Sequence, residues 1–274
     1  RRDAEWMLAA GMLSTVPAIV INSLFSPIGL NAIGLDAYEA GSWGEGMILF
    51  LSAPIGEELS KAFAFLMLSH LIVSPKYGFY IGSTVGLGFA LLENAQYIFM
   101  ALAGDNSGLA YFFTASLRGL SSIPGHALWT GLSGYAIGCW LDRNPKARRV
   151  LDRSPFLTPD AEAQWVLYDA KGQPTASSGW AKRPSQRMAN ILKRHEHHAW
   201  RMPQTVPMGL GFAVLGHALW NGSSWGVNRA LSNDDSTLAL LLELSWLVVM
   251  IFGLWVCILR WLPTVVLSAN DDQR

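Results

Sequence analysis

Charged residues and cysteines are scarce in this chain of 274 residues. Only 15% of its residues are charged and 51% are hydrophobic, whereas ordinary globular domains have about 25% charged residues. This composition excludes an ordinary soluble domain. The two cysteines, Cys139 and Cys257, lie near the ends of apolar runs, so disulfides in exposed loops are not indicated. No cleavable signal is recognisable, and a chain that begins with Arg1 leaves open a longer precursor.

The abundant apolar residues are gathered into long runs. A helix needs about 20 such residues to cross a bilayer, and runs rich in Gly, Ala and Trp with few β-branched alternations favour helices over barrel strands. We therefore expect an all-α, polytopic membrane helix bundle of about six spans. The expected spans are residues 6–25, 46–73, 79–102, 120–140, 208–225 and 238–261. A shorter run at 109–117 is too short to span and indicates an interfacial or re-entrant segment.

Basic residues concentrate between the fourth and fifth runs. Residues 142–204 hold 12 of the 20 Lys and Arg residues against 6 acidic ones, and the positive-inside rule places this stretch in the cytoplasm. Threading six spans from that anchor puts both chain ends in the cytoplasm too. We expect the organisation to be membrane helices one to four in residues 1–142, a cytoplasmic loop or small subdomain in 143–204, and helices five and six in 205–274.

Two features of this basic loop have alternative interpretations. Its middle, "DAEAQWVLYDAKGQPTASSG", alternates apolar residues around a Lys-Gly turn, which is typical of a small hairpin; a partly disordered linker is the alternative. The tract "HEHH" at 195–198 has His195 and His198 at a spacing that can bind metal. Because Lys193 and Arg194 precede it, we expect a basic surface near lipid head groups instead.

The second apolar run contains charges that hydrocarbon does not tolerate. Each charged side chain at the centre of a span costs roughly 2.5 to 3.5 kcal/mol, yet "APIGEELSKAFAFLMLSHLIV" at 53–73 carries Glu57, Glu58 and Lys61. Glu57 and Lys61 have the i, i+4 spacing of a helical ion pair. Adjacent helical residues diverge by about 100°, so one glutamate should face the centre while the other supports it or pairs with Lys61.

Further ionisable residues lie at a similar depth on other runs. Lipid cannot solvate such groups, so they must face one another or a water-filled pocket. We expect side chains from four helices to converge around one water-accessible cavity. These side chains are Glu57 or Glu58, Glu93, His126 and His217, with Asn221 one helical turn beyond His217.

A cluster of carboxylates and histidines suits two kinds of chemistry. Hydrolysis needs a base that activates water, donors for an oxyanion and often a metal. Proton or ion transport needs titratable groups near the membrane midplane. The residues alone therefore leave open a hydrolase and a proton-coupled transporter or channel, and an inert membrane scaffold of the same fold is a third hypothesis. A scaffold would tolerate loss of the glutamates, and a transporter would show gradient-dependent flux.

Four short motifs resemble those of a known family. "EELSK" at 57–61 resembles the E-E-x-x-K motif of the PrsW family of intramembrane proteases, and "GLGFALLEN" at 86–94 resembles its F-x-x-x-E-N motif. "HALWT" at 126–130 and "HALWN" at 217–221 resemble its two histidine motifs. The matches keep the family's order over residues 46–225, outside the basic loop. The family is distantly similar to the CAAX prenyl endoproteases, which share a paired-Glu helix and a late H-x-x-x-N helix.

The resemblance implies an intramembrane endopeptidase and assigns roles to the matched residues. Glu57 or Glu58 would be the general base, and His217 and Asn221 would bind the oxyanion of the tetrahedral intermediate. Glu93 and His126 would orient water or bind metal. Supporting positions in the same motifs are Lys61, which would pair with a glutamate, Phe89, Asn94 and Thr130.

The resemblance also bears on cofactor and partners. Glu93, His126 and His217 form a zinc-type ligand set, but neither histidine lies in H-E-x-x-H, so zinc and a metal-free glutamate mechanism both stay open. The implied substrate is a single-span membrane protein such as an anti-sigma factor, in a bacterial cytoplasmic membrane. The lipid bilayer is the other expected partner and nucleic acid is not expected; the sequence does not determine the oligomeric state.

Overall fold

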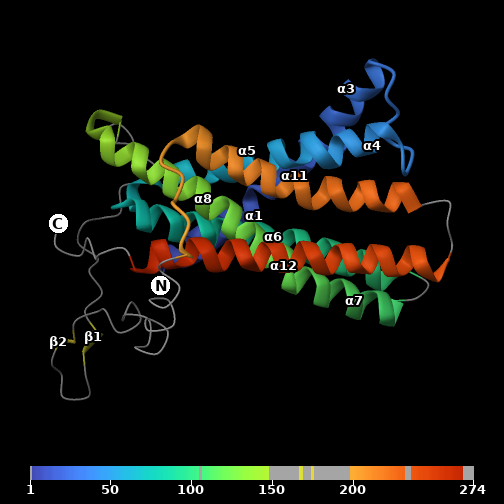
Figure 1. The fold of residues 1–274 in the computed structure, drawn as a ribbon. Coiled ribbons are helices and arrows are strands. Elements are labelled where there is room, and N and C mark those ends of the chain that lie inside the picture. The colour runs from blue at the N-terminus through green and yellow to red at the C-terminus, as the bar shows by residue number, and fades with distance from the viewer. Residues whose placement is uncertain are drawn as a thin grey trace.

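The computed structural model is a bundle of long helices (Figure 1). It describes residues 2–104, 107–147, 167–168, 174–175, 198–231 and 236–267. Strands β1 (Leu167–Tyr168) and β2 (Pro174–Thr175) pair antiparallel, Leu167 opposite Thr175. This pairing lies within the segment for which a small hairpin is expected, and the remaining residues from 148 to 197 lie outside the described part of the chain.

Each of the six expected runs coincides with helix. The first run comprises α1 (Arg2–Leu13), α2 (Thr15–Val20), the π-helical η1 (Ile21–Phe25) and α3 (Ser26–Ala32), and the second comprises α4 (Trp43–Met47), the π-helical η2 (Ile48–Ser52), α5 (Ala53–Met67) and the 3₁₀ turn η3 (Ser69–Leu71). The other four runs are α6 (Pro75–Ala103), α8 (Ser122–Arg143), α11 (Val206–Leu231) and α12 (Thr237–Leu267). The short run at 109–117 lies in α7 (Ser107–Leu120).

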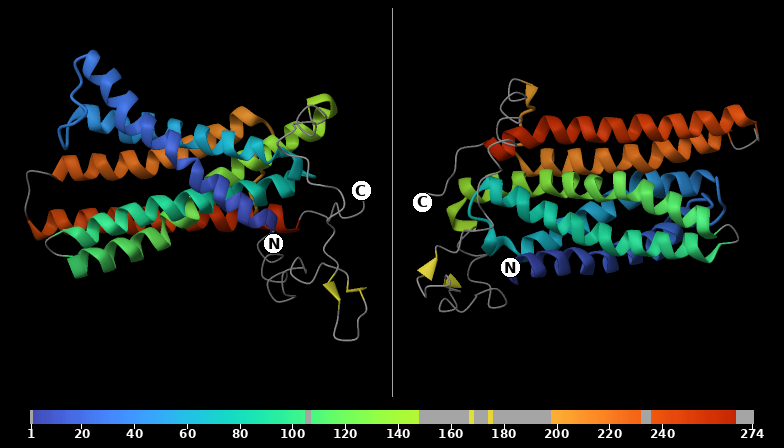
Figure 2. Two further views of the ribbon diagram at one scale, coloured as in Figure 1. Left: turned by 180° about the vertical axis from the view of Figure 1, so that it is seen from behind. Right: turned by 90° about the horizontal axis from the view of Figure 1, so that it is seen from below.

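The structure confirms a helical membrane bundle. In the described part of the chain, three helices are long and apolar enough to cross a membrane, namely Asp3–Ala32, Pro75–Ala103 and Thr237–Val266. Helix α1 begins and α12 ends at the same end of the bundle, where α8 also ends (Figures 1 and 2). A chain that crosses the membrane an even number of times has both of its ends on the same side, as this arrangement has. The count of six spans and the cytoplasmic side of that end stay predictions.

Two prolines explain the π-helical turns in the first and second runs, each of which forms one helical rod. Pro27 and Pro54 lie in the first turn of α3 and α5, directly after η1 and η2. Proline lacks an N–H and its ring clashes with the carbonyl four residues earlier, and a π-turn relieves that clash by widening the helix. The hydroxyls of Ser26 and Ser52 hydrogen-bond to each other between the two rods. This contact fixes the start of α5 beside the first rod.

Glycines allow α6 and α8 to pack backbone to backbone. A Cβ on Gly82 would collide with the carbonyl of Thr130, and a Cβ on Gly86 would collide with that of His126. Close approach through small residues is the usual packing mode of membrane helices. It places the part of α6 that carries Glu93 directly against the part of α8 that carries His126.

Candidate active site

The two adjacent glutamates of α5 have different environments. Lys61 Nζ donates to Glu58 Oε1 at 2.7 Å and lies 3.7 Å from Glu57 Oε2. Glu58 and Lys61 are 1% and 0% exposed, whereas Glu57 lines a cavity and accepts a hydrogen bond from Asn22 Nδ2 at 3.3 Å. The structure thus confirms that one glutamate faces the centre while the other pairs with Lys61. The closest partner of Lys61 is Glu58 at i, i+3, not Glu57 at i, i+4.

His217 on α11 faces both glutamates. Its Nδ1 lies 3.2 Å from Glu58 Oε1, and its Nε2 lies 3.6 Å from Glu57 Oε2. The indole of Trp129 stacks on the imidazole, with ring centroids 4.9 Å apart and planes 14° apart. Because a carboxylate only accepts hydrogen bonds, Nδ1 carries a proton. Nε2 is therefore the nitrogen that His217 presents to Glu57 and the cavity.

His126 on α8 is held at both ring nitrogens. Lys61 Nζ lies 2.8 Å from Nδ1, and Glu93 Oε2 lies 3.0 Å from Nε2. An ammonium group has no acceptor, so Lys61 donates to Nδ1 and His126 donates from Nε2 to Glu93. Phe89 completes this environment, with its ring 5.2 Å from the imidazole and 4.0 Å from Lys61 Nζ.

Glu93 is anchored by an arginine from α7. Arg118 Nη2 donates to Glu93 Oε2 at 2.6 Å, and its Nε donates to Asn94 Oδ1 at 2.5 Å. Its guanidinium also lies 3.9 Å from the centre of the Tyr97 ring, and Ser122 donates to Asn94 Oδ1 at 2.8 Å. The sequence motifs did not identify Arg118 as a site residue. A signal was present, because Arg118 is the only Lys, Arg, Asp or Glu between residues 106 and 141.

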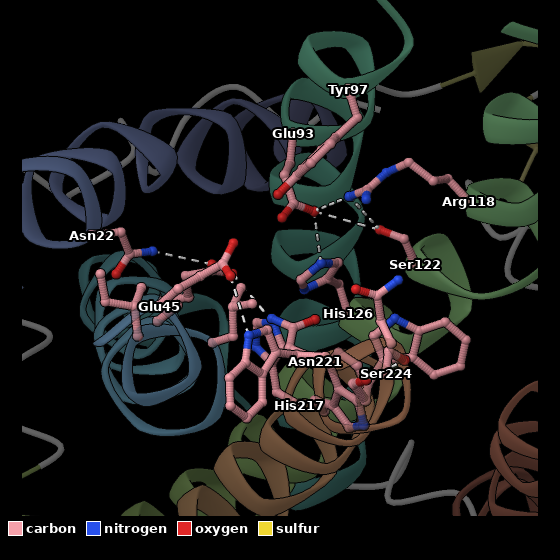
Figure 3. A pocket seen from close by; sticks show the side chains of 18 of the residues that line it. Asn22, Glu45, Glu93, Tyr97, Arg118, Ser122, His126, His217, Asn221 and Ser224 are labelled. Atoms are coloured by element: carbon pink, nitrogen blue, oxygen red, sulfur yellow. Dashed lines mark hydrogen bonds and ion pairs between the residues drawn. The ribbon is translucent and has the colours of Figure 1, made fainter. Parts of the chain in front are cut away.

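One cavity of about 560 Å³ is bordered by Glu57, Glu93, Arg118, His126 and His217. Figure 3 shows Glu93, His126, His217 and Asn221 directed into it from α6, α8 and α11. Thr130, one turn from His126, is buried in the contact between α8 and Gly86 of α6 and does not line the cavity. The geometry therefore brings the expected carboxylates and histidines together, as their depth in the sequence predicts.

The structure holds a group of side chains that could bind a metal, and its composition differs from the predicted set. Glu57, His126 and His217 each offer a ligand atom, and these atoms lie within 4.8 Å of one another. Glu93 stands behind His126 as its hydrogen-bond partner. Arg118 from α7 also holds the Glu93 carboxylate, with Nη2 2.6 Å from Oε2. The metal group of this structure thus has Glu57 where the sequence analysis placed Glu93.

The chemistry of this group fits zinc. Glutamate oxygen and imidazole nitrogen are zinc ligands, and Glu57 Oε2 is buried without a hydrogen-bond partner among the described residues. Each histidine has a carboxylate on one ring nitrogen: Glu93 on Nε2 of His126 and Glu58 on Nδ1 of His217. Histidines that bind zinc also pair one ring nitrogen with a carboxylate. The Nδ1 atom of His126 already accepts from Lys61, so a metal at that nitrogen requires the ammonium group to withdraw.

The tract at 195–198 lies, except for the exposed His198, outside the described residues.

Comparison with known proteins assigns the chain to a family. Residues 4–155 match the family model described as PrsW family intramembrane metalloprotease. No curated protein and no solved structure matches the chain. The matched part holds Glu57, Glu93 and His126 and ends before α11, so the involvement of His217 rests on its contacts. With a match over more than half of its length, the chain belongs to the PrsW family of intramembrane proteases and is an integral membrane protein.

Proposed function

We propose that this chain is an intramembrane endopeptidase that uses Glu57 to activate water, with single-span membrane proteins such as an anti-sigma factor as substrates. The observation that carries the proposal is the position of Glu57. Its buried Oε2 has no hydrogen-bond partner in the described part of the chain and lies 3.6 Å from His217 Nε2, and the residue lines a cavity. A carboxylate with a free oxygen beside space for water and substrate is suited to general-base catalysis.

The reaction would proceed by proton transfer through Glu57. The carboxylate takes a proton from water while the water oxygen bonds to the carbonyl carbon of the scissile peptide. Collapse of the tetrahedral intermediate breaks the carbon–nitrogen bond, and Glu57 returns the proton to the leaving nitrogen. Asn221, which lines the same cavity one turn from His217, would donate its amide N–H to the developing oxyanion.

His217 has two mutually exclusive roles in this scheme. If Nε2 carries a proton, the imidazolium donates to the oxyanion beside Asn221. If Nε2 is unprotonated, its lone pair is available to a metal held with Glu57 and His126. A bound zinc ion would supply Lewis-acid polarisation of the scissile carbonyl. In both cases Glu58, which accepts from Nδ1, sets the orientation of the ring.

The experiment compares glutamate variants of the purified full chain on a labelled single-span substrate, with and without chelator. Glu57→Gln keeps the shape but cannot act as a base, so cleavage should fall by roughly two to four orders of magnitude. Glu58→Gln should lose less, because Glu58 does not line the cavity. Glu243→Gln on α12, whose carboxylate accepts from Asn228, is the matched control and should cleave normally.

Two outcomes would contradict the proposal. Near-normal cleavage by a folded Glu57→Gln variant would leave the reaction without its base. Absence of cleavage in the wild type, together with gradient-driven proton flux that depends on Glu57, would instead identify a transporter.

A further inference from the structure

A second cavity, of about 770 Å³, lies at the end of the bundle where α8 ends. It is a groove lined by residues of α5, of the last turns of α8 and of the start of α11. Its lining includes Phe63 and Leu66 of α5, Ile137 and Trp140 of α8, and Pro207 and Leu210 of α11. Phe63 is 67% exposed and Leu66 is 36% exposed, so the groove opens at the surface. In an integral membrane protein, such exposed apolar side chains contact lipid.

The polar residues that line this groove are gathered at one end of it. Arg143 and Asn144 come from the end of α8, and Gln204 and Thr205 come from the segment just before α11. Of the described residues that line the groove, Arg143 alone carries a formal charge. The groove therefore has one cationic end and an apolar remainder, which is the division found in a phospholipid molecule.

The guanidinium of Arg143 is already oriented. Its Nη1 donates to the backbone oxygen of Gln204 at 3.1 Å, and its Nη2 donates to Gln204 Oε1 at 2.9 Å. A guanidinium has five N–H donors, so these two bonds fix the group and leave other donors for a ligand. Arginine pairs with phosphate through parallel, charge-assisted hydrogen bonds, and basic pockets between membrane helices bind anionic lipid head groups.

We propose that this groove binds one anionic phospholipid, with its phosphate on Arg143 and an acyl chain along Phe63, Leu66 and Leu210. An extended peptide is a poorer occupant, because the helices that wall the groove use their backbone groups internally and offer no strand edge. The lipid would contact both α5 and α11, the helices that carry Glu57 and His217. It would thus stabilise the relative position of these two side chains, which lie 3.6 Å apart and line the same cavity.

Tryptophan quenching tests this inference on the purified full chain in detergent. Phosphatidylglycerol with brominated acyl chains should quench the fluorescence of Trp140 at lower concentration than the matching phosphatidylcholine. A Trp140→Phe variant should lack this additional quenching, which identifies Trp140 as its source. Arg143→Gln should raise the phosphatidylglycerol midpoint roughly 5- to 10-fold and leave the phosphatidylcholine midpoint unchanged.

The matched control is Arg260→Gln. Arg260 lies on α12 near the same end of the bundle, donates to the His198 carbonyl at 3.2 Å and does not line the groove, so its loss should leave the midpoint unchanged. Equal wild-type midpoints for the two lipids would overturn the proposal without any variant. An equal effect of Arg260→Gln and Arg143→Gln would also overturn it, because binding would then be non-specific. If neither brominated lipid quenches Trp140 and a brominated single-span substrate does, the groove binds a protein partner and the lipid site is refuted.

Discussion

Replacing Lys61 by Met removes the buried cation that connects Glu58 to His126 and keeps a side chain of similar length. Lys61 is 0% exposed, and its Nζ lies 2.7 Å from Glu58 Oε1. Removing one partner of such a buried pair destabilises a protein by about 3 to 5 kcal/mol. Because Glu58 keeps its contact with His217 Nδ1 at 3.2 Å, we expect the lower value, about 3 kcal/mol.

The matching double variant separates loss of the ion pair from loss of packing. Lys61→Met with Glu58→Gln leaves two neutral side chains, so the buried charge without a partner disappears. We expect the double variant to be less destabilised than the sum of the two single variants, by at least about 1 kcal/mol. At roughly 2 to 4 °C per kcal/mol, Lys61→Met should lower the melting temperature by about 6 to 12 °C, and the double variant should recover part of that loss.

The assay is thermal unfolding of the purified full chain in detergent. Lys76→Met is the control, since Lys76 is partly exposed at the start of α6 and donates to the Val266 carbonyl at 3.5 Å. Such a surface contact contributes at most about 1 kcal/mol, which is roughly 2 to 4 °C. If Lys61→Met melts with the wild type, or if the two single effects simply add, the ion pair does not stabilise the cluster as described.

Three further predictions concern catalysis, metal and topology. Asn221→Ala should slow cleavage about 100- to 1000-fold with little change in KM, and a wild-type rate would show that Asn221 does not bind the oxyanion. Zinc content and cleavage rate measured together for His217→Ala separate the two roles of His217: loss of a metal ligand lowers both, and loss of an oxyanion donor lowers the rate alone. Cysteine accessibility labelling from outside should tag residues 30–45 and 232–236 and miss 142–204; labelling of 142–204 would reverse the topology.

The convergence of the site could be predicted because the membrane restricts where ionisable groups can lie. Glu57, His126 and His217 sit at similar depth on different apolar runs, and a charge facing lipid is too costly. Helical geometry also separated the roles of adjacent glutamates, since residues about 100° apart cannot share one face. The structure confirms both inferences in the pairing of Glu58 with Lys61 and the exposure of Glu57 to the cavity.

The depth of each residue within its apolar run does not determine which side chains contact one another in the site. Glu93 and Glu57 reach the same level, and only the rotation of each helix about its axis decides which carboxylate joins the two histidines. In the structure Glu57 lies with the two histidines, while Glu93 pairs with Arg118 at 2.6 Å and with His126 at 3.0 Å. The helix of Arg118, α7, extends several residues beyond the apolar run at 109–117 and packs beside α6 and α8. The stacking of Trp129 on His217 likewise depends on how α8 and α11 pack, and no local pattern encodes it.

The position of the site also explains how its helices remain in the membrane. In the described chain, α5, α8 and α11 are not among the three helices that are long and apolar enough to cross a membrane on their own, and they carry Glu57, His126 and His217. Polar side chains on these helices contact partners on other helices, as Glu58 contacts His217 and His126 contacts Glu93, in addition to the pair of Glu58 with Lys61 within α5. Glycine-mediated contact between α8 and α6, which is apolar enough to span, brings His126 to its partner. The same contacts that assemble the Glu/His cluster therefore offset the cost of placing its charges within the bundle.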